Sequence, residues 1–171
     1  MGTLSSCLHE AEPFSRRRPR DPEGAVLREE EETMTTVEIK IRGYHEDRFG
    51  HVNNARYLEL FEAARWEYLE ERGLTTTFFE EHGIFPVVAR ISISYRRPAS
   101  IGDRLHITAS VIRAGHRKFV MGQEARFAET GDLCAEAEVT AVFVDKRTGR
   151  PAVLSEEILD AWPELRPSTE A

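Results

Sequence analysis

Apolar and polar side chains alternate where the regular part of the chain begins. Residues 35–42 place Val37, Ile39 and Ile41 at every second position, which is the period of a half-buried strand. A polar loop over residues 43–52 follows, and the apolar period then changes to three and four residues. The pattern therefore predicts a strand, a loop and a helix in succession.

The helix predicted over residues 54–72 is the clearest element of the sequence. Apolar residues recur on one face, and charged residues occupy the other. Asn53 or Asn54 is a suitable N-cap, and Gly73 is a suitable C-terminal stop. The apolar face contains Tyr57, Leu58, Phe61, Ala64 and Tyr68, and the outward face contains Glu59, Glu62, Glu70 and Arg72.

Strand-like alternation dominates the rest of the chain. Turn residues separate four such segments, over residues 85–97, 104–113, 118–127 and 133–145, and a short closing helix is predicted over residues 155–162. One apolar helix that precedes four hairpin-linked antiparallel strands must pack on the concave face of their sheet. The expected fold is α+β, with a curved antiparallel sheet of about five strands wrapped around a long central helix.

Residues 1–33 differ from the rest in composition. They contain an arginine-rich stretch at 16–20, an acidic run at 29–32 and few apolar residues. Such a segment cannot bury enough surface to offset its ordering entropy. We therefore expect a disordered extension over 1–33, one domain over 34–165 and a flexible tail over 166–171. Met34 begins the strand pattern, so we hypothesise that translation starts there, which the intact mass of the native protein would test.

Composition restricts the class of protein. With 171 residues, of which 40% are apolar and 31% are charged, the chain is typical of one globular domain, and we expect it in the cytoplasm. The net charge of −7 argues against nucleic acid as a partner, because neutralising phosphates requires clustered cations. No apolar stretch approaches the ~18 residues of a membrane span. Cys7 and Cys134 are expected to be unpaired thiols.

The segment RGYHEDRFGHVNNARYLELFEAARW, at residues 42–66, gathers groups that could carry chemistry. A helix start presents unpaired N–H groups and a partial positive charge, which can stabilise the oxyanion of an acyl transfer. A carboxylate just upstream could activate water or attack directly. Each group also has a structural interpretation as a loop contact, a helix cap or a core side chain. The groups are Asp47, His51, Asn53, Asn54 and Tyr57.

Other candidate sites are weaker. His82, His106 and His116 have no partners at the spacing of metal ligands, so no metal is expected. A set of cations near the predicted strand ends could meet the phosphates of a cofactor, although such side chains are more often solvated turn residues. The set contains Arg96, Arg97, Arg113, Arg117 and Lys118.

The segment at 42–66, with GHVNNARYLE, resembles the signature of the 4-hydroxybenzoyl-CoA thioesterase superfamily, supported downstream by ISYRRPASIGD at 93–103. More narrowly, it resembles the bacterial long-chain acyl-CoA thioesterases. The resemblance covers about residues 35–162. It implies a hotdog fold, in which the sheet wraps around a long helix. It also implies homodimers or homotetramers with active sites at the dimer interface, and no catalytic cofactor, because CoA is part of the substrate.

The resemblance also assigns roles to residues. Asp47 would be the general base or the nucleophile, and His51 would be its partner. The helix start would supply the oxyanion donor through Asn53, Asn54, Ala55 and Arg56, and Tyr57 would line the pocket. The candidate contacts to the CoA phosphates are Arg96, Arg97, Arg117 and Lys118.

Two departures from relatives refine this interpretation. Many relatives carry Asp-x-Asp in the loop, whereas His45 holds the first position here. The corresponding loop of plant acyl-carrier-protein thioesterases resembles the pattern Asp-x-Asn-x-His. Here Phe49 holds the middle position of that pattern, which favours acyl-CoA over an acyl carrier protein as the carrier of the substrate.

The function predicted from the sequence is hydrolysis of fatty acyl-CoA, of medium to long chain, to free fatty acid and CoA in fatty acid metabolism. Leu58, Phe61 and Trp66 are candidates for the apolar wall of the acyl site, or for plain core. The alternatives are a non-catalytic acyl-thioester-binding module, an acyl-carrier-protein thioesterase, and a dehydratase or hydratase of the same fold. The last needs a different histidine–carboxylate arrangement, which the sequence does not contain.

Overall fold

A computed structural model describes residues 34–115 and 117–166 of the chain. The extension predicted over residues 1–33, Cys7, His116 and the tail beyond Arg166 lie outside the described residues. The strands are β1 (Thr35–Lys40), β2 (Ile84–Tyr95), β3 (Arg104–Ala114), β4 (Lys118–Phe127) and β5 (Leu133–Asp145). The helices are α2 (Asn54–Glu70), α3 (Thr76–Glu81) and α4 (Glu156–Ala161), with 3-10 turns η1 (Gly43–His45) and η2 (Pro163–Leu165).

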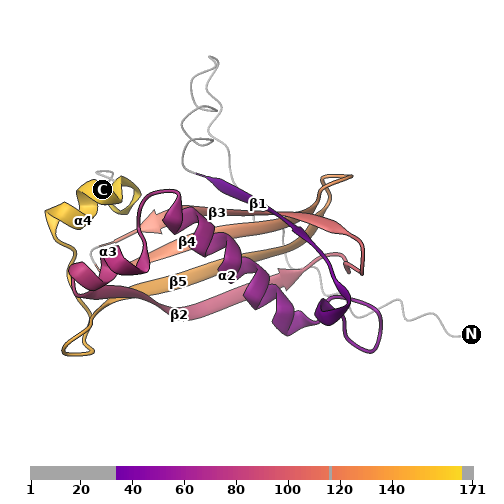
Figure 1. The fold of residues 1–171 in the computed structure, drawn as a ribbon, viewed down its shortest axis with the longest axis horizontal. Coiled ribbons are helices and arrows are strands. Elements are labelled where there is room, and N and C mark those ends of the chain that lie inside the picture. The colour runs from indigo at the N-terminus through magenta and orange to yellow at the C-terminus, as the bar shows by residue number, and fades with distance from the viewer. Residues whose placement is uncertain (1–33, 116, 167–171) are drawn as a thin grey trace, which may run out of the picture.

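The five strands form one antiparallel sheet in the order β1-β3-β4-β5-β2, and α2 crosses one face of it diagonally (Figure 1). The predictions of an α+β fold, a five-stranded sheet and a long central helix are therefore confirmed. The expectation of four strands linked by hairpins is wrong in one respect. Strand β2 pairs with β5 and not with its neighbour in sequence, β3, so the chain crosses the sheet between them.

Helix α2 buries a broader stripe than the sequence pattern predicted. Tyr57, Phe61, Ala64 and Tyr68 are buried as expected, together with Leu60 and Leu69. Leu58 is 40% exposed, so its predicted place on the buried face is wrong. Arg72 does not face away from the protein, because its guanidinium lies over the Tyr68 ring and bonds Glu164.

The inner face of the sheet completes the core beneath α2. Alternate residues of three strands are buried there, as the period of two requires. Trp162, fully buried after α4, packs on Phe119 and Phe143 and donates its indole N–H to the Tyr68 hydroxyl at 3.1 Å. The C-terminal segment therefore closes one end of the core, and the start of α2 lies at the other end, beside the end of β2. The buried sheet residues include Leu105, Ile107, Ala109, Met121, Ala125, Ala137, Val139 and Ala141.

Candidate active site

The loop between β1 and α2 folds back on itself as a tight hairpin. Glu46 and Val52 form an isolated antiparallel bridge, and the Asp47 N–H donates to the His51 carbonyl at 2.9 Å. The turn between them closes with a 3.2 Å bond from the Gly50 N–H to the Asp47 carbonyl. Gly50 has φ of 78°, a left-handed conformation that costs glycine little. The hairpin therefore places Asp47 and His51 opposite each other.

One oxygen of the Asp47 carboxylate is hydrogen-bonded within the turn. Its Oδ1 accepts the Phe49 N–H at 2.8 Å, whereas Oδ2 has no hydrogen-bond partner among the described residues. Asp47 is half-buried, and His51 is exposed. One oxygen of Asp47 thus holds the loop, and the other remains available to water or to a substrate.

His45 joins the beginning of the loop to the beginning of α2. Its Nδ1 accepts the Arg42 N–H at 3.0 Å, and its carbonyl accepts the Asn53 N–H at 2.9 Å. The residue is 7% exposed, and burial, with the neighbouring Arg56, lowers the pKa of its imidazole. A neutral imidazole is the form that can accept at Nδ1. This residue, which departs from the Asp-x-Asp pattern, is therefore part of the framework of the site.

The loop is docked onto residues 99–101 of the second motif segment. The Val52 N–H donates to the Ala99 carbonyl at 2.8 Å, and the Ser100 hydroxyl donates to the Gly50 carbonyl at 2.9 Å. The Ile101 N–H bonds the Glu46 carboxylate. The structure thus brings the two segments that carry the family resemblance into direct contact.

The first turn of α2 begins two residues after His51. Asn53 is the N-cap: its Oδ1 accepts the Ala55 N–H at 2.9 Å, and its carbonyl accepts the Arg56 N–H at 2.9 Å. Among the first three amides of the helix, only that of Asn54 has no acceptor within the described residues. If residues 53–56 supply the oxyanion donor predicted from the sequence, the Asn54 N–H is the amide that can do so, and the helix dipole would assist it.

Contacts from distant segments fix the start of the helix in place. The Tyr95 hydroxyl, at the end of β2, donates to the Asn54 carbonyl at 3.1 Å. The Tyr57 hydroxyl lies 3.2 Å from the Cys134 sulfur, and the Cys134 thiol donates to the Arg97 carbonyl at 3.3 Å. Sequence reasoning missed Tyr95 and Cys134 as parts of the site, although Tyr95 lies within the second motif segment.

Tyr57 and Cys134 are core residues. Tyr57 is 3% exposed, and burial raises the pKa of its phenol, as burial also raises the pKa of the Cys134 thiol. The structure therefore puts Tyr57 beneath the helix start rather than on an open pocket surface. Of the candidates for an apolar wall, Phe61 is 1% exposed and belongs to the core, whereas Leu58 and Trp66 are 40% and 39% exposed.

The candidate phosphate-binding cations fall into two separate groups. Arg96 and Arg97 follow β2 and pair with Glu136 and Asp132, respectively. Arg117 and Lys118 lie at the other end of the sheet and are exposed. The amides of Arg96 and Arg97 bond the carbonyl of Cys134, and Lys118 pairs with Val142 on the same strand. Eight residues of strand correspond to ~26 Å, so the two groups cannot contact the same phosphate.

The described residues were also compared with the requirements of a metal site, a membrane span and a disulfide. Within residues 34–115 and 117–166, no three histidine, cysteine, aspartate or glutamate side chains lie close enough together to hold a metal ion. No helix in the described part of the chain is long and apolar enough to cross a membrane. Cys134 is a free thiol, as expected.

Comparison with known proteins places the chain in a family. Residues 42–162 match the thioesterase-like superfamily. The long-chain acyl-CoA thioesterase FadM of Escherichia coli K12 is 39% identical over 129 residues, which are 75% of this chain and 97% of FadM. The acyl-CoA thioesterase YbgC of Haemophilus influenzae is 30% identical over 129 residues, which are 74% of this chain and 93% of YbgC.

A solved structure agrees with the sequence relatives. The crystal structure of YbaW, a probable thioesterase from Escherichia coli, superposes with a TM-score of 0.70 at 36% identity, covering 77% of this chain and 98% of YbaW. The predicted resemblance and the predicted hotdog fold are therefore confirmed. The chain belongs to the thioesterase-like superfamily and is a thioester hydrolase of the hotdog fold.

Proposed function

We propose that the chain hydrolyses fatty acyl-CoA, of medium to long chain, to free fatty acid and CoA. The observation that carries the proposal is the pairing of Asp47 with His51 across one tight turn, directly before the N-terminus of α2. A relative 39% identical over most of both chains is named a long-chain acyl-CoA thioesterase, which supports acyl-CoA as the substrate class.

The proposed reaction begins at the Asp47 carboxylate. Acting as a general base, it takes a proton from water, and the water oxygen attacks the thioester carbonyl carbon. The electron pair of the carbonyl moves to its oxygen, where the Asn54 N–H and the helix dipole stabilise the negative charge. Collapse of this intermediate breaks the C–S bond, and the proton held by Asp47 passes to the departing sulfur.

The same carboxylate could instead attack the thioester as a nucleophile. An acyl–aspartyl anhydride would form as the C–S bond breaks, and water would then hydrolyse it to the same products. In both routes His51 lies across the turn from Asp47, where it positions the water. Neither route uses a metal or a further cofactor, since CoA enters as part of the substrate.

Asp47→Asn tests the proposal directly. The asparagine keeps an acceptor for the Phe49 N–H, so the loop should fold, but it has no carboxylate. Thiol release from acyl-CoA esters of increasing chain length should fall by about 100-fold or more, the usual contribution of a general base. A loss of less than about tenfold, roughly 1.4 kcal/mol of transition-state energy, would exclude Asp47 from the chemistry.

Asp145→Asn is a matched control, because Asp145 also holds a turn, by accepting the Thr148 N–H far from the loop. It should leave thiol release unchanged. His51→Ala should reduce the rate less than Asp47→Asn. A wild-type protein that releases no thiol from any acyl-CoA would redirect the assay to acyl-carrier-protein esters, and failure there would indicate a binding module without turnover.

A further inference from the structure

Arg65, in the middle of α2, is a half-buried cation whose hydrogen-bond partner is neutral. Its Nη1 donates to the Gln123 side-chain oxygen at 2.8 Å, and Gln123, which is 2% exposed, donates in turn to the Phe61 carbonyl at 2.8 Å. Arg65 forms no ion pair within residues 34–115 and 117–166. Burial lowers the pKa of its guanidinium, because the charged form loses hydration. A charge that is buried without an anion is costly to keep, which favours a functional role for Arg65.

The guanidinium of Arg65 keeps donors available for a ligand. It has five N–H groups, and its bond to Gln123 uses one of them. No nitrogen or oxygen of a buried or half-buried side chain in the described part of the chain is both fully enclosed and without a hydrogen-bond partner. The Arg65 nitrogens that form no bond are therefore accessible from outside the core. Glu62, one turn earlier on α2, attracts the charge but forms no ion pair with it among the described residues.

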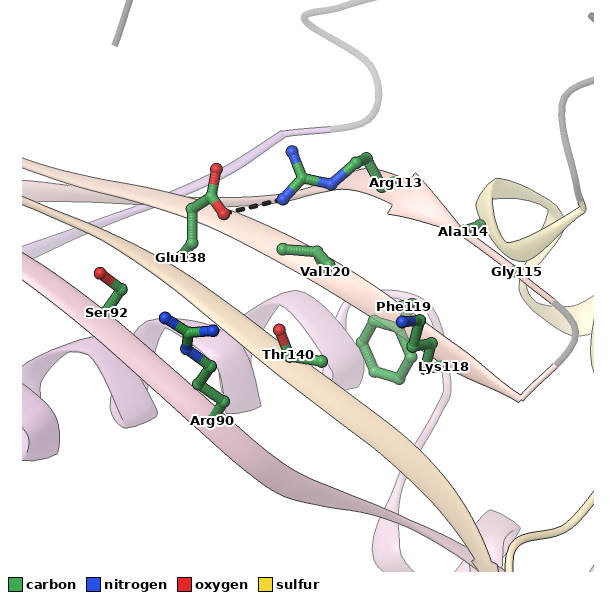
Figure 2. A pocket seen from close by; sticks show the side chains of 10 residues that line it. All are labelled: Arg90, Ser92, Arg113, Ala114, Gly115, Lys118, Phe119, Val120, Glu138 and Thr140. Atoms are coloured by element: carbon green, nitrogen blue, oxygen red, sulfur yellow. Dashed lines mark hydrogen bonds and ion pairs between the residues drawn. The ribbon is translucent and has the colours of Figure 1, made fainter. Parts of the chain in front are cut away.

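Half-buried apolar side chains lie beside Arg65 on the face of the sheet that is turned towards α2. The helix packs mainly against β1 and β3, which leaves β2 less completely covered on this face. Figure 2 shows the opposite face, where Ser92 of β2 lines a hollow. Ile91 and Ile93 alternate with Ser92, so they point to the helix side of the sheet. Both are half-buried, and they form part of an apolar strip between β2 and α2.

Strand register places Arg65 at this apolar strip. Gln123 pairs with Ala137, and Ala137 pairs with Ile93, so the three side chains form one row across β4, β5 and β2. Arg65 bonds the first member of the row, and the small Ala137 side chain separates it from Ile93. On the helix, Leu58 lies two turns before Arg65 on the same side and is 40% exposed. The apolar strip therefore consists of Leu58, Ile91 and Ile93, with a cation beside it.

The distance from the start of α2 to the guanidinium matches an acyl chain of medium length. The guanidinium reaches Gln123 beside the Phe61 carbonyl, so it lies between the levels of Phe61 and Arg65 along the helix. These residues are seven and eleven positions after Asn54, which at ~1.5 Å per residue corresponds to about 10–16 Å. Carbon–carbon bonds of ~1.5 Å advance an extended acyl chain by roughly 1.3 Å per carbon. A chain that starts at Asn54 and follows the strip therefore meets the guanidinium after about 8 to 12 carbons.

We propose that Arg65 determines the acyl-chain length, because its guanidinium ends the apolar strip and so limits the number of methylenes that contribute to binding. This inference rests on the proposed function, since it takes the thioester to lie at the start of α2. A methylene chain that passes the guanidinium displaces its water without supplying an acceptor, and this cost offsets the hydrophobic gain. Arg65 is thus a specificity-determining residue and takes no part in the proton transfers at Asp47.

Alkyl-CoA thioethers of increasing length test the proposal without turnover, because a thioether cannot be hydrolysed. In calorimetric titrations of the full chain, the wild-type affinity should rise by about twofold to fourfold per carbon, as for a buried methylene, and should level off at about 8 to 12 carbons. In Arg65→Met, which has an unbranched apolar side chain, the rise should continue for at least about two further carbons. Arg65→Lys keeps the charge and should level off as the wild type does.

Arg147→Met is the matched control, because Arg147 is exposed in the turn after β5 and lies outside the strip. Its affinities should equal those of the wild type at every chain length. Wild type and Arg65→Met levelling off at the same length would overturn the proposal. A wild-type affinity that does not depend on chain length, or the absence of binding, would overturn it as well.

A measurement on the wild type alone does not depend on how well the variants fold. A thioether of the limiting length that ends in a hydroxyl should bind at least as tightly as the plain alkyl thioether, because the guanidinium can donate to its oxygen. An apolar site would instead leave the hydroxyl without a partner. Binding of the hydroxyl thioether that is tenfold weaker than that of the plain one would overturn the proposal.

Thiol release and sedimentation separate this inference from its alternatives. A wild type that shows the length limit with thioethers but releases no thiol from acyl-CoA would contradict the proposed hydrolysis and leave the role of Arg65 supported. Thiol release with a chain-length profile that Arg65→Met does not change would support hydrolysis and contradict the role of Arg65. Loss of an oligomer in Arg65→Met with an unchanged length limit would show that Arg65 contacts a second copy of the chain, and the proposal would fail.

Discussion

The single residue His45 makes the stability of the loop depend on pH. Its Nδ1 accepts the Arg42 N–H, which only the neutral ring can do, and burial lowers the pKa of the imidazole below its ordinary value near 6.5. A lowered pKa in the folded state means that the unfolded chain binds the proton more readily. His45 therefore contributes its full stability above about pH 6.5, and this contribution is lost as the pH falls towards the lowered pKa.

His45→Asn tests this linkage, because asparagine can offer an acceptor to the Arg42 N–H but does not titrate. Between about pH 7 and pH 5, the unfolding free energy of the wild type should fall more steeply than that of the variant. Urea denaturation at a series of pH values measures both curves. Curves that run parallel over this interval would show that His45 keeps its ordinary pKa in the folded protein.

The candidate site was partly predictable at this scale. Asp47, His51 and the Asn53 cap lie within seven residues, so local turn and capping chemistry brings them together. Tyr95 and Cys134 lie 41 and 77 residues along the chain from the helix residues that they contact. No local pattern marks them, since only the folded sheet brings the end of β2 and the start of β5 to the helix N-terminus.

At the scale of the element, the stability of the first turn of α2 depends on the side chain of its N-cap, Asn53. Asn53→Ala removes the acceptor for the Ala55 N–H and should lower the unfolding free energy by about 1 kcal/mol, the usual value of an N-cap. Asn53→Ser supplies another capping oxygen and should recover most of the loss. Urea denaturation compares the three proteins. An alanine variant as stable as the wild type would show that the cap does not hold the helix start.

Element boundaries were more predictable than element order. The period of two located β4 and β5 at their observed bounds and β1, β2 and β3 within one or two residues, because burial of one face imposes that period. Helix α3 was missed because its six residues are too short for a helical period. The bulges at Ala89 and Ile112 and the pairing of β2 with β5 depend on neighbouring strands, so the chain's own alternation does not reveal them.

At the scale of the whole molecule, β2 forms one edge of the sheet, with no further strand beside it among residues 34–115 and 117–166. It is a 12-residue strand at the end of the sheet order, and it exposes Val87 by 45% and Val88 by 44%. A long apolar edge with unpaired backbone groups favours pairing with another strand. The end of this strand also carries Tyr95, which fixes the helix start. The homodimer expected from the family resemblance would therefore form along this edge, with β2 of one copy beside β2 of the other.

Val87→Glu/Val88→Glu should abolish this pairing, because the two copies would bring carboxylates together along the shared edge. Sedimentation equilibrium should show a monomer, and thiol release should fall with it, since the helix start of each copy would lose its neighbour. Val153→Glu is the control, because Val153 is 64% exposed and lies outside the sheet. It should leave both readouts unchanged. A monomeric variant that still hydrolyses acyl-CoA at the wild-type rate would show that each chain carries a complete site by itself.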